Sequence, residues 1–457
     1  MTETIASRSD GPVIRIDAVT PDGLAAALEQ SPAFVKGFAE LSDFKAKAGQ
    51  TLVVPGGDGR IGAVLFGLGE TPQAMTFRQL PAKLPAGDYH VGSMPDGLTL
   101  DQIALAFATG GYRFDRYKKK TDPKPRLILE GADLSEIQAV AHACALARDM
   151  VNTPANDMGP RQIETIAREI AEQFGASISV VTGDALLEAN YPAVHAVGRA
   201  AHPDRAPRMI EVSWGSSGPL VAIIGKGVVF DTGGLDLKPS SGMRLMKKDM
   251  GGAAHALALA RMVMAAKLPI RLAVLVPAVE NAVSGDAMRP GDILNSRKGL
   301  TIEVGNTDAE GRLILADALA RAAELEPALT IDMATLTGAA RVALGPQVIP
   351  FYTADDTLAA DIDAASRAHA DPLWRMPLWA GYDEAVDSDI ADLKNDPDAW
   401  AQAGSVTAAL FLQRFAPRPW VHLDIFAWNP KGRPGWPVGA ETQAIRALYA
   451  VLKGRFA

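Results

Sequence analysis

The stretch Leu220-Val-Ala-Ile-Ile-Gly-Lys-Gly-Val-Val-Phe-Asp231 is the clearest indicator of the fold class. Its first five residues form a near-continuous apolar run, which is typical of a strand covered by helices on both faces. A glycine-containing loop follows, then a helical pattern at about 252–266 and another apolar strand at 270–276. This strand–helix–strand order predicts a mostly parallel sheet with helices on both faces.

The same alternation extends over the rest of the chain. The patterns predict helices at about 100–107, 134–151, 162–174 and 317–325, and strands at 51–54, 61–66, 127–129, 177–181 and 329–333. A chain of 457 residues is too long for one typical core, so we expect two domains. The predicted α/β architecture has a small N-terminal α/β domain (1–135), a linker helix (136–155) that Pro154 ends, and a larger C-terminal domain (156–457). The larger domain holds the mostly parallel central sheet, flanked by helices.

Composition excludes several classes of protein. Hydrophobic residues make up 48% and charged residues 21%, which is an ordinary globular balance. The formal net charge of −8 disfavours nucleic acid and anionic membranes as partners. One basic cluster, 118–120 with Lys124 and Arg126, is interpreted as a solvated loop. The N-terminus has no apolar signal core and the longest apolar runs are too short to span a bilayer, so we expect a cytoplasmic protein.

Cysteine and histidine chemistry is also disfavoured. Cys144 is the only cysteine and lies in an apolar stretch, so we expect a buried helix residue rather than a catalytic thiol. The seven histidines show no spacing that would let two of them share a metal. We interpret His255 and His422 as hydrogen-bonded core residues.

Carboxylates instead gather just after the buried strands, where sites in such sheets form. Asp308 and Glu310 are two residues apart, so in an extended stretch their side chains would point the same way. Together with Asp231 and Asp249 they would repel one another strongly unless two divalent cations neutralised them. Spacing alone leaves an equal alternative, in which the four residues are separate caps and loop turns.

The run Asn306-Thr-Asp-Ala-Glu-Gly-Arg-Leu313 resembles in full the signature of the leucyl aminopeptidase family, which includes cytosolic leucine aminopeptidase and bacterial aminopeptidase A. Four more positions match the family's spacing: Lys226, Asp231, Lys238 and Asp249. The resemblance continues through 334–339 and 420–424 and covers the chain from about 152 to its end. The N-terminal domain resembles the family only weakly.

The resemblance implies a catalytic C-terminal domain that removes single residues from peptides with a free N-terminus, with a preference for apolar residues such as leucine. It implies two divalent ions per subunit, Zn²⁺ or Mn²⁺, which lower the pKa of a bound water. The implied metal ligands are Lys226, Asp231, Asp249, Asp308 and Glu310, with Asp231 and Glu310 shared by both ions. The implied catalytic pair is Lys238, which stabilises the oxyanion, and Arg312, which holds a bicarbonate. The implied substrate-bordering residues are Met246, Thr335, Leu336, Thr337 and Gly338.

Other interpretations of single residues stay open. Arg312 could form a salt bridge to a site carboxylate, and Met246 could fill the core. Many relatives have small residues and a shorter connection after Asp424, whereas this chain has Phe426 and Trp428, which would reshape the pocket for the first side chain. The resemblance also implies a homohexamer.

Rival functions fit less well. The glycines at 225 and 227 lack the third glycine of a dinucleotide-binding loop, since position 230 is Phe230, and the phosphate-loop pattern is absent. The run Gly215-Ser-Ser-Gly218 is one residue short of a serine-hydrolase elbow. The remaining alternative is a non-catalytic or dual-role member of the family that binds DNA or regulates, which the acidic balance disfavours.

Overall fold

The computed structural model describes residues 4–119, 122–397 and 402–457. The chain divides into two compact units, Met1–Ala145 with Pro430–Val438, and Leu146–Asn429 with Gly439–Ala457. Helix α4 (Ser135–Asn152) continues through the point of division, where the sequence predicts a helix. The predicted division into domains at 135 and 155 stays a prediction.

A nine-stranded sheet organises the second unit, in the order β16-β15-β18-β14-β9-β11-β8-β7 with β10 paired to β11. The central pairs are parallel, and antiparallel pairs lie toward the edges. Its strands are β7 (Ser177–Thr182), β8 (Arg208–Trp214), β9 (Leu220–Gly225), β10 (Gly227–Asp231), β11 (Arg271–Asn281), β14 (Leu329–Ala334), β15 (Ile349–Tyr352), β16 (Leu373–Arg375) and β18 (Trp420–Asp424). The predicted mostly parallel sheet is confirmed.

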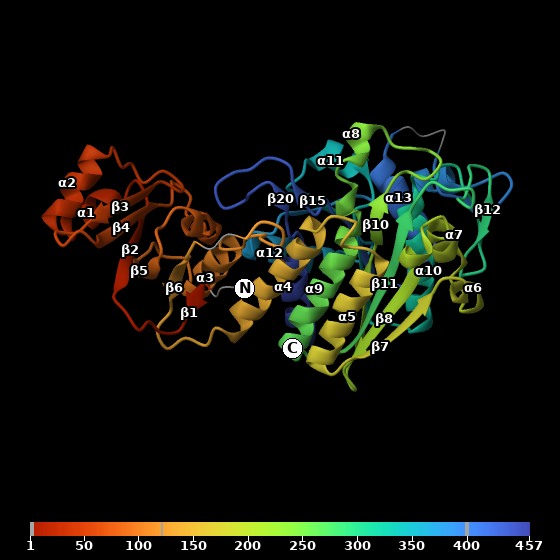
Figure 1. Cartoon of the computed structure of the whole chain (residues 1–457), viewed down its shortest axis with the longest axis horizontal. Helices are drawn as coiled ribbons and strands as arrows, with labels where there is room; N and C mark the ends of the chain where they lie inside the picture. The colour runs from red at the N-terminus through yellow and green to blue at the C-terminus, as the bar shows by residue number, and fades with distance from the viewer. Residues whose placement is uncertain (1–3, 120–121, 398–401) are drawn as a thin grey trace. The chain divides into compact units, whose positions relative to one another are not determined.

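Helices cover both faces of this sheet, and the sequence of β9 shows why. Ala222 and Ile224 of β9 pack into the same cluster as residues of α10, and α9 contacts β9 as well. Figure 1 shows α5 and α9 side by side along the sheet. The helices are α5 (Pro160–Phe174), α6 (Ala185–Glu188), α7 (Pro192–Gly198), α8 (Ser240–Met243), α9 (Gly251–Ala265), α10 (Glu310–Glu324), α11 (Gly338–Leu344), α12 (Asp356–Ala368), α13 (Gly404–Gln413) and α14 (Ile445–Phe456).

Short elements complete this unit. A three-residue 3₁₀ helix, η2 (Pro203–Arg205), precedes β8, and η3 (Met246–Met250) leads directly into α9. Two small sheets are formed by β12 (Ile293–Asn295), β13 (Thr301–Glu303) and β17 (Leu393–Lys394), and by β19 (Trp428–Asn429) and β20 (Gly439–Ala440). The 3₁₀ helix η4 (Ala380–Val386) precedes β17.

The first unit has its own six-stranded sheet in the order β1-β6-β5-β2-β4-β3, parallel except for the β3–β4 pair. Its elements are β1 (Ile5–Ala6), β2 (Val13–Val19), α1 (Leu24–Glu29), α2 (Ala33–Leu41), β3 (Thr51–Pro55), β4 (Ile61–Gly67), η1 (Ala74–Ala82), β5 (Gly87–Ser93), α3 (Leu100–Gly110) and β6 (Pro125–Ile128). The predicted small α/β domain therefore has the expected fold class.

Several single-residue predictions also have outcomes. Cys144 is buried in α4, as predicted. His255 is fully buried and hydrogen-bonded through both ring nitrogens, to Gly251 O and from Gln443 N. His422 is equally buried, and its Nδ1 is hydrogen-bonded to Asp332 Oδ1 at 2.6 Å, whereas its Nε2 has no hydrogen-bond partner among the described residues.

The basic cluster is only partly a loop. Lys118 and Lys119 are exposed, but Arg126 lies in β6 and pairs with Asp88. Residue 120 lies outside the described residues. Within the part of the chain that is described, no helix has the length and apolar character needed to cross a membrane.

Candidate metal centre

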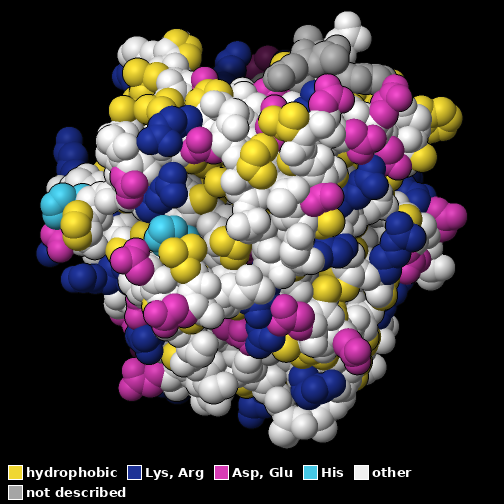
Figure 2. Space-filling model, turned by 90° about the vertical axis from the view of Figure 1, so that its right-hand side faces the viewer, with side chains coloured by type: hydrophobic (Ala, Val, Ile, Leu, Met, Phe, Trp, Pro, Cys, Tyr) yellow, Lys and Arg dark blue, Asp and Glu magenta, His cyan; other side chains and the backbone are white. Residues whose placement is uncertain are grey.

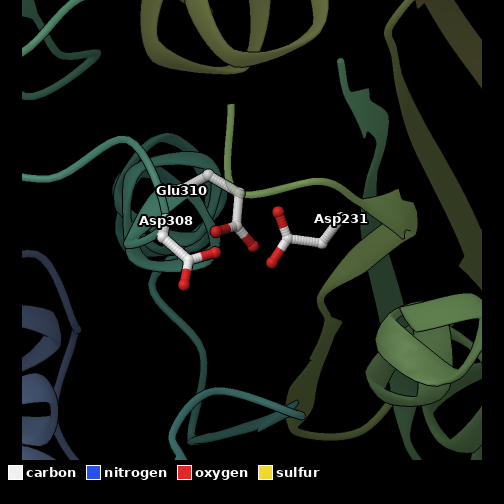
Figure 3. A group of neighbouring side chains, drawn as sticks. All are labelled: Asp231, Asp308 and Glu310. Atoms are coloured by element: carbon white, nitrogen blue, oxygen red, sulfur yellow. The ribbon is translucent and has the colours of Figure 1, made fainter. Parts of the chain in front are cut away.

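Three carboxylates meet beyond the carboxyl end of β10. Asp231 is the last residue of β10, Glu310 is the first residue of α10, and Asp308 lies in the turn before it. One carboxylate oxygen from each lies within 4.8 Å of the others, and Figure 3 shows the three side chains pointing toward one another. The structure therefore brings together residues about 80 positions apart, as sites at strand ends require.

The backbone around Asp308 differs from the expectation. The prediction of an extended stretch is wrong, because Glu310 already belongs to α10. Asn306 closes the turn: its Oδ1 accepts a hydrogen bond from Asp308 N at 2.8 Å, which is the local bond that asparagine commonly makes in turns. The two carboxylates converge because a turn feeds directly into a helix.

Lys226 and Asp249 complete one side of the cluster. Lys226 lies between β9 and β10, and its Nζ is 2.8 Å from Asp249 Oδ2 and 2.8 Å from Glu310 Oε1. The Lys226 side chain is 3% exposed, which rules out a surface lysine. Gly311 makes the approach possible, since a Cβ there would lie 2.6 Å from Lys226 Nζ.

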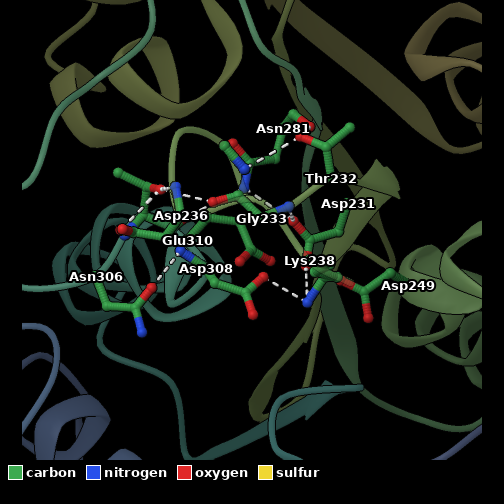
Figure 4. Close-up of polar contacts among 12 residues, drawn as sticks. Asp231, Thr232, Gly233, Asp236, Lys238, Asp249, Asn281, Asn306, Asp308 and Glu310 are labelled. Carbon is green, nitrogen blue, oxygen red and sulfur yellow. Dashed lines mark hydrogen bonds and ion pairs between the residues drawn. The ribbon is translucent and has the colours of Figure 1, made fainter. Parts of the chain in front are cut away.

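Lys238 lies on the other side of the cluster. Its Nζ is 2.9 Å from Asp231 Oδ2 and also contacts Asp308 Oδ1 (Figure 4). The loop that carries it turns at Gly233, whose φ of +89° is a conformation that glycine adopts without strain. A Cβ at Gly233 would lie 2.4 Å from Asp236 O.

Asn281 orients Asp231 and was not singled out from the sequence. Its Nδ2 donates to Asp231 Oδ1 at 2.8 Å, and the same oxygen accepts from Gly233 N at 2.9 Å (Figure 4). Asn281 ends β11 directly opposite Asp231 in the parallel pair β10–β11. A polar residue closing a long apolar strand is the signal that would have found it.

The crowded carboxylates perturb one another. Burial, together with the charge of Asp231, raises the pKa of Glu310 to about 8 and that of Asp308 to about 6. Burial also opposes ionisation of Asp249, but Lys226 and Lys248 outweigh it and hold its pKa below the usual range. The cluster therefore carries negative charge that the protein alone neutralises incompletely.

The two lysines respond in the opposite direction. Burial would lower the pKa of Lys226, but Asp249, Glu310 and Asp231 outweigh it and hold that pKa above its ordinary value. The pKa of Lys238 is likewise raised, since Asp231 and Asp308 outweigh burial. A depressed Lys226 pKa, which the resemblance requires of a metal ligand, depends on the positive charge of bound ions.

The donor set fits divalent cations. Asp249 Oδ2, Asp308 Oδ1 and Glu310 Oε1 are buried, and each lies at ion-pair distance from a lysine nitrogen. Buried carboxylates are costly unless they are paired or bind a cation. Oxygen ligands with one amine nitrogen suit zinc or manganese.

Arg312 follows Glu310 by two residues in α10 and is 8% exposed. Its Nη1 donates to Asn395 O, and its Nε has no hydrogen-bond partner within the described part of the chain. Among the described residues it forms no ion pair, so the salt bridge to a site carboxylate that the sequence left open is not found. Burial lowers its pKa against the opposing charges of Asp396, Glu310 and Asp424.

The segment after β14 borders the cluster. Thr335 Oγ1 contacts Asp249 Oδ1 at 2.8 Å, and the backbone nitrogens of Leu336 and Thr337 each donate to Asp424 Oδ1 at 3.0 Å. Gly338 begins α11. Asp424 is thus an anchor of this segment, a role that its place at the end of β18 could have indicated.

Two residues close to Asp249 in sequence are Met246, which was predicted to border the substrate, and Lys248, which was not singled out. Met246 begins η3 and is half-buried, which leaves both core filling and pocket lining open. Lys248 is 3% exposed and donates to Asp249 Oδ1 at 2.9 Å. A lysine between another lysine and an aspartate would be predicted to be exposed, so no local sequence pattern indicated that Lys248 is buried.

Family models agree with this geometry. Residues 145–449 match the catalytic domain of the cytosol aminopeptidase family, and residues 14–130 match the N-terminal domain of the M17 aminopeptidases. The chain belongs to the cytosol aminopeptidase family. It is therefore a peptide hydrolase of the aminopeptidase class, and the predicted family is confirmed.

Cytosol aminopeptidase relatives match along most of their length. A probable cytosol aminopeptidase from Syntrophotalea carbinolica is 39% identical, over 90% of this chain and 89% of the relative. Another, from Rhizobium johnstonii, is 38% identical and covers 97% of both chains. The N-terminal domain, which the sequence linked only weakly to the family, is part of the match.

Solved structures show the same architecture. The cytosol aminopeptidase from Coxiella burnetii superposes with a TM-score of 0.94 at 41% identity, covering 99% of this chain and 100% of that one. The bottromycin maturation enzyme BotP, in complex with Mn, superposes with a TM-score of 0.86 at 33% identity, covering 96% and 99%.

Proposed function

We propose that this cytosol aminopeptidase family member hydrolyses the first peptide bond of peptides with a free N-terminus, at a site holding two divalent ions, Zn²⁺ or Mn²⁺. The observation that carries the proposal is the convergence of Asp231, Asp308 and Glu310, which each place one carboxylate oxygen within 4.8 Å of the others. The Mn complex of BotP, a relative at 33% identity, supports the metal class.

Five side chains of this chain would hold the two ions. Asp231 and Glu310 would contact both ions, Asp249 and Lys226 would complete one site, and Asp308 would complete the other. When bound, such ions supply a Lewis acid and a water of lowered pKa. Buried carboxylates held by fixed hydrogen bonds keep the site rigid, which is what a preorganised catalytic centre needs.

Lys238 would stabilise the developing oxyanion. Its raised pKa keeps it cationic, and its side chain is only 14% exposed, so its charge acts in a poorly solvated site. Arg312 would hold a bicarbonate that moves protons, since its Nε lacks a hydrogen-bond partner. Thr335, Leu336, Thr337 and Gly338 would border the peptide, with Met246 contributing an apolar wall that accepts side chains such as leucine.

The assembly and cellular setting follow from the same proposal. We infer a cytoplasmic homohexamer, in which residues 1–135 form a domain separate from the catalytic residues 156–457. Figure 2 shows one face of the molecule, on which Lys and Arg side chains are interspersed with Asp and Glu. That face offers no continuous basic surface, so it does not favour the DNA-binding alternative.

Hydrolysis of aminoacyl-p-nitroanilides by chelator-treated protein tests this function. We expect leucyl-p-nitroanilide to be cleaved only after manganese or zinc is added. Acetylation of the substrate amine should abolish cleavage, because the site requires a free N-terminus. Cleavage that is unaffected by chelation, or no cleavage with any metal, would reject the proposal.

A further inference from the structure

Arg341 is a cation beside the substrate-bordering segment. It lies in α11, one turn after Gly338, and is half-buried. Its Nη1 donates to Thr337 O at 3.0 Å. Over the described ranges, no carboxylate lies at ion-pair distance from its guanidinium. Removing a charge from water is costly unless the charge is paired, so the partly buried charge of Arg341 needs explanation.

The guanidinium also faces an aromatic ring. Its central carbon lies 4.5 Å from the centroid of Phe426, which is 8% exposed, and Lys248 Nζ lies 5.9 Å from the same centroid. Lys248 has its own counter-ion in Asp249. A cation–π contact contributes about 0.5–2 kcal/mol and leaves the guanidinium's remaining N–H donors available.

The two carboxylates that act on Arg341 electrostatically already have other partners. Asp249 contacts Lys226 and Lys248, and Asp424 accepts hydrogen bonds from the Leu336 and Thr337 backbone. Burial lowers the pKa of the Arg341 guanidinium, and these two carboxylates act against it only from beyond ion-pair distance. An arriving anion would be the first direct ionic partner of Arg341.

Phe426 and Arg341 together could bind a side chain that has an apolar stem and an anionic end. The ring would contact methylene groups, and the planar fork of a guanidinium pairs with both oxygens of a carboxylate. Glutamate has this chemistry, with a stem similar in length to leucine.

We propose that Arg341 binds a carboxylate of the peptide substrate, such as the side chain of an N-terminal glutamate. The proposal rests on the aminopeptidase function proposed above. The same chemistry is available from the free C-terminal carboxylate of a dipeptide, so the two sources are distinguished by experiment.

The test compares isosteric substrates that differ in charge. In the first arm, kcat/KM of the metal-loaded enzyme is measured for glutamyl- and glutaminyl-p-nitroanilide. In the second arm, it is measured for leucyl-leucine and leucyl-leucinamide. We expect the wild type to prefer the carboxylate in one arm by about 10- to 100-fold, the range of a charge-assisted pair, and Arg341→Gln to bring that ratio close to one.

Controls separate this role from a structural one. Arg367→Gln changes an arginine of α12 that is 78% exposed and should leave both ratios unchanged. Arg341→Lys should keep part of the preference, and it serves as the test variant should Arg341→Gln fail to fold, with melting temperature as the measure of folding.

The outcomes are distinct. A preference in the first arm that Arg341→Gln removes supports an acidic first residue, and one confined to the second arm supports the C-terminal carboxylate. A wild-type ratio near one in both arms, or ratios that Arg341→Gln leaves unchanged, would overturn this inference alone if leucyl-p-nitroanilide is still cleaved. Failure to cleave any substrate would overturn the proposed function as well.

Discussion

The ammonium of Lys226 lies 2.8 Å from a carboxylate oxygen of Asp249, and both side chains are 3% exposed. A buried ion pair recovers its desolvation cost only when the geometry is good and further contacts support it. Here a second carboxylate, Glu310, shares the same ammonium. The protein thus holds the carboxylates together before any ion binds, with the lysine as the counter-charge.

Replacing that counter-charge should destabilise the metal-free protein. Lys226→Met leaves Asp249 and Glu310 buried with less compensation, and breaking such a pair costs about 3–5 kcal/mol. We expect a melting temperature several degrees lower in chelator. Lys247→Met, at a half-buried lysine that donates to Asn152 O, is the matched control and should have a smaller effect. Equal melting temperatures for Lys226→Met and wild type would contradict a stabilising role.

Lys238→Ala should lower turnover more than substrate affinity. If Lys238 acts on the oxyanion, its contact forms chiefly in the transition state, and loss of one such donor lowers kcat by about 10²–10³. Steady-state kinetics on leucyl-p-nitroanilide would show this fall with KM changed by less than about threefold. A change confined to KM would show that Lys238 binds substrate instead.

Asp424 should control the geometry of the substrate-bordering segment. It accepts hydrogen bonds from Leu336 N, Thr337 N and, at 2.6 Å, Thr337 Oγ1. Asp424→Ala leaves backbone donors unpaired at a cost of about 1–3 kcal/mol each, so we expect a higher KM and lower kcat/KM. Asp424→Asn retains an acceptor oxygen and should recover part of the loss. Wild-type KM in the alanine variant would argue against this anchoring.

Asp317 should make stability depend on pH. It is fully buried in α10 and accepts hydrogen bonds from Arg297 N, Ala193 N and Val194 N, yet burial dominates and raises its pKa to about 7. Because the folded pKa lies above the unfolded value, its contribution is present in full below about pH 4 and is lost as pH rises through 7.

The variant Asp317→Asn mimics the protonated carboxyl and isolates this effect. Melting temperatures measured between pH 4 and pH 8 should show wild type losing stability relative to the variant as pH rises. A difference that stays constant over that range would mean that Asp317 does not change protonation there.

The sequence predicted elements best where burial is uniform. The apolar run that became β9 has helices on both faces, so its pattern carried the information needed. The start of α10 was predicted at 317 instead of Glu310. The first residues of α10 serve the site, because Glu310 faces the cluster and Gly311 makes room for Lys226, whereas the residues from Leu313 to Ala316 pack into the core.

The residues of the candidate site were also predicted only in part. Residues in the family signature could be named from the sequence, and the structure places Asp231, Asp308 and Glu310 together. Lys248 could not, because its role depends on a contact with Asp249 that burial creates. Asn281 was missed although it closes a long apolar strand, and its contact with Asp231 arises from strand pairing. No local pattern distinguishes a buried, paired lysine from a solvated one.

Bound metal and activity measured on the same samples would decide whether the carboxylate cluster is a catalytic two-metal site. Manganese per chain and leucyl-p-nitroanilide hydrolysis would be determined for wild type, Asp308→Ala and Glu310→Ala, with melting temperature confirming folding. We expect two ions per chain in wild type, fewer in each folded variant, and loss of hydrolysis by at least about 10³ in both. Full activity in either variant, or an unchanged metal content in both, would contradict the assignment.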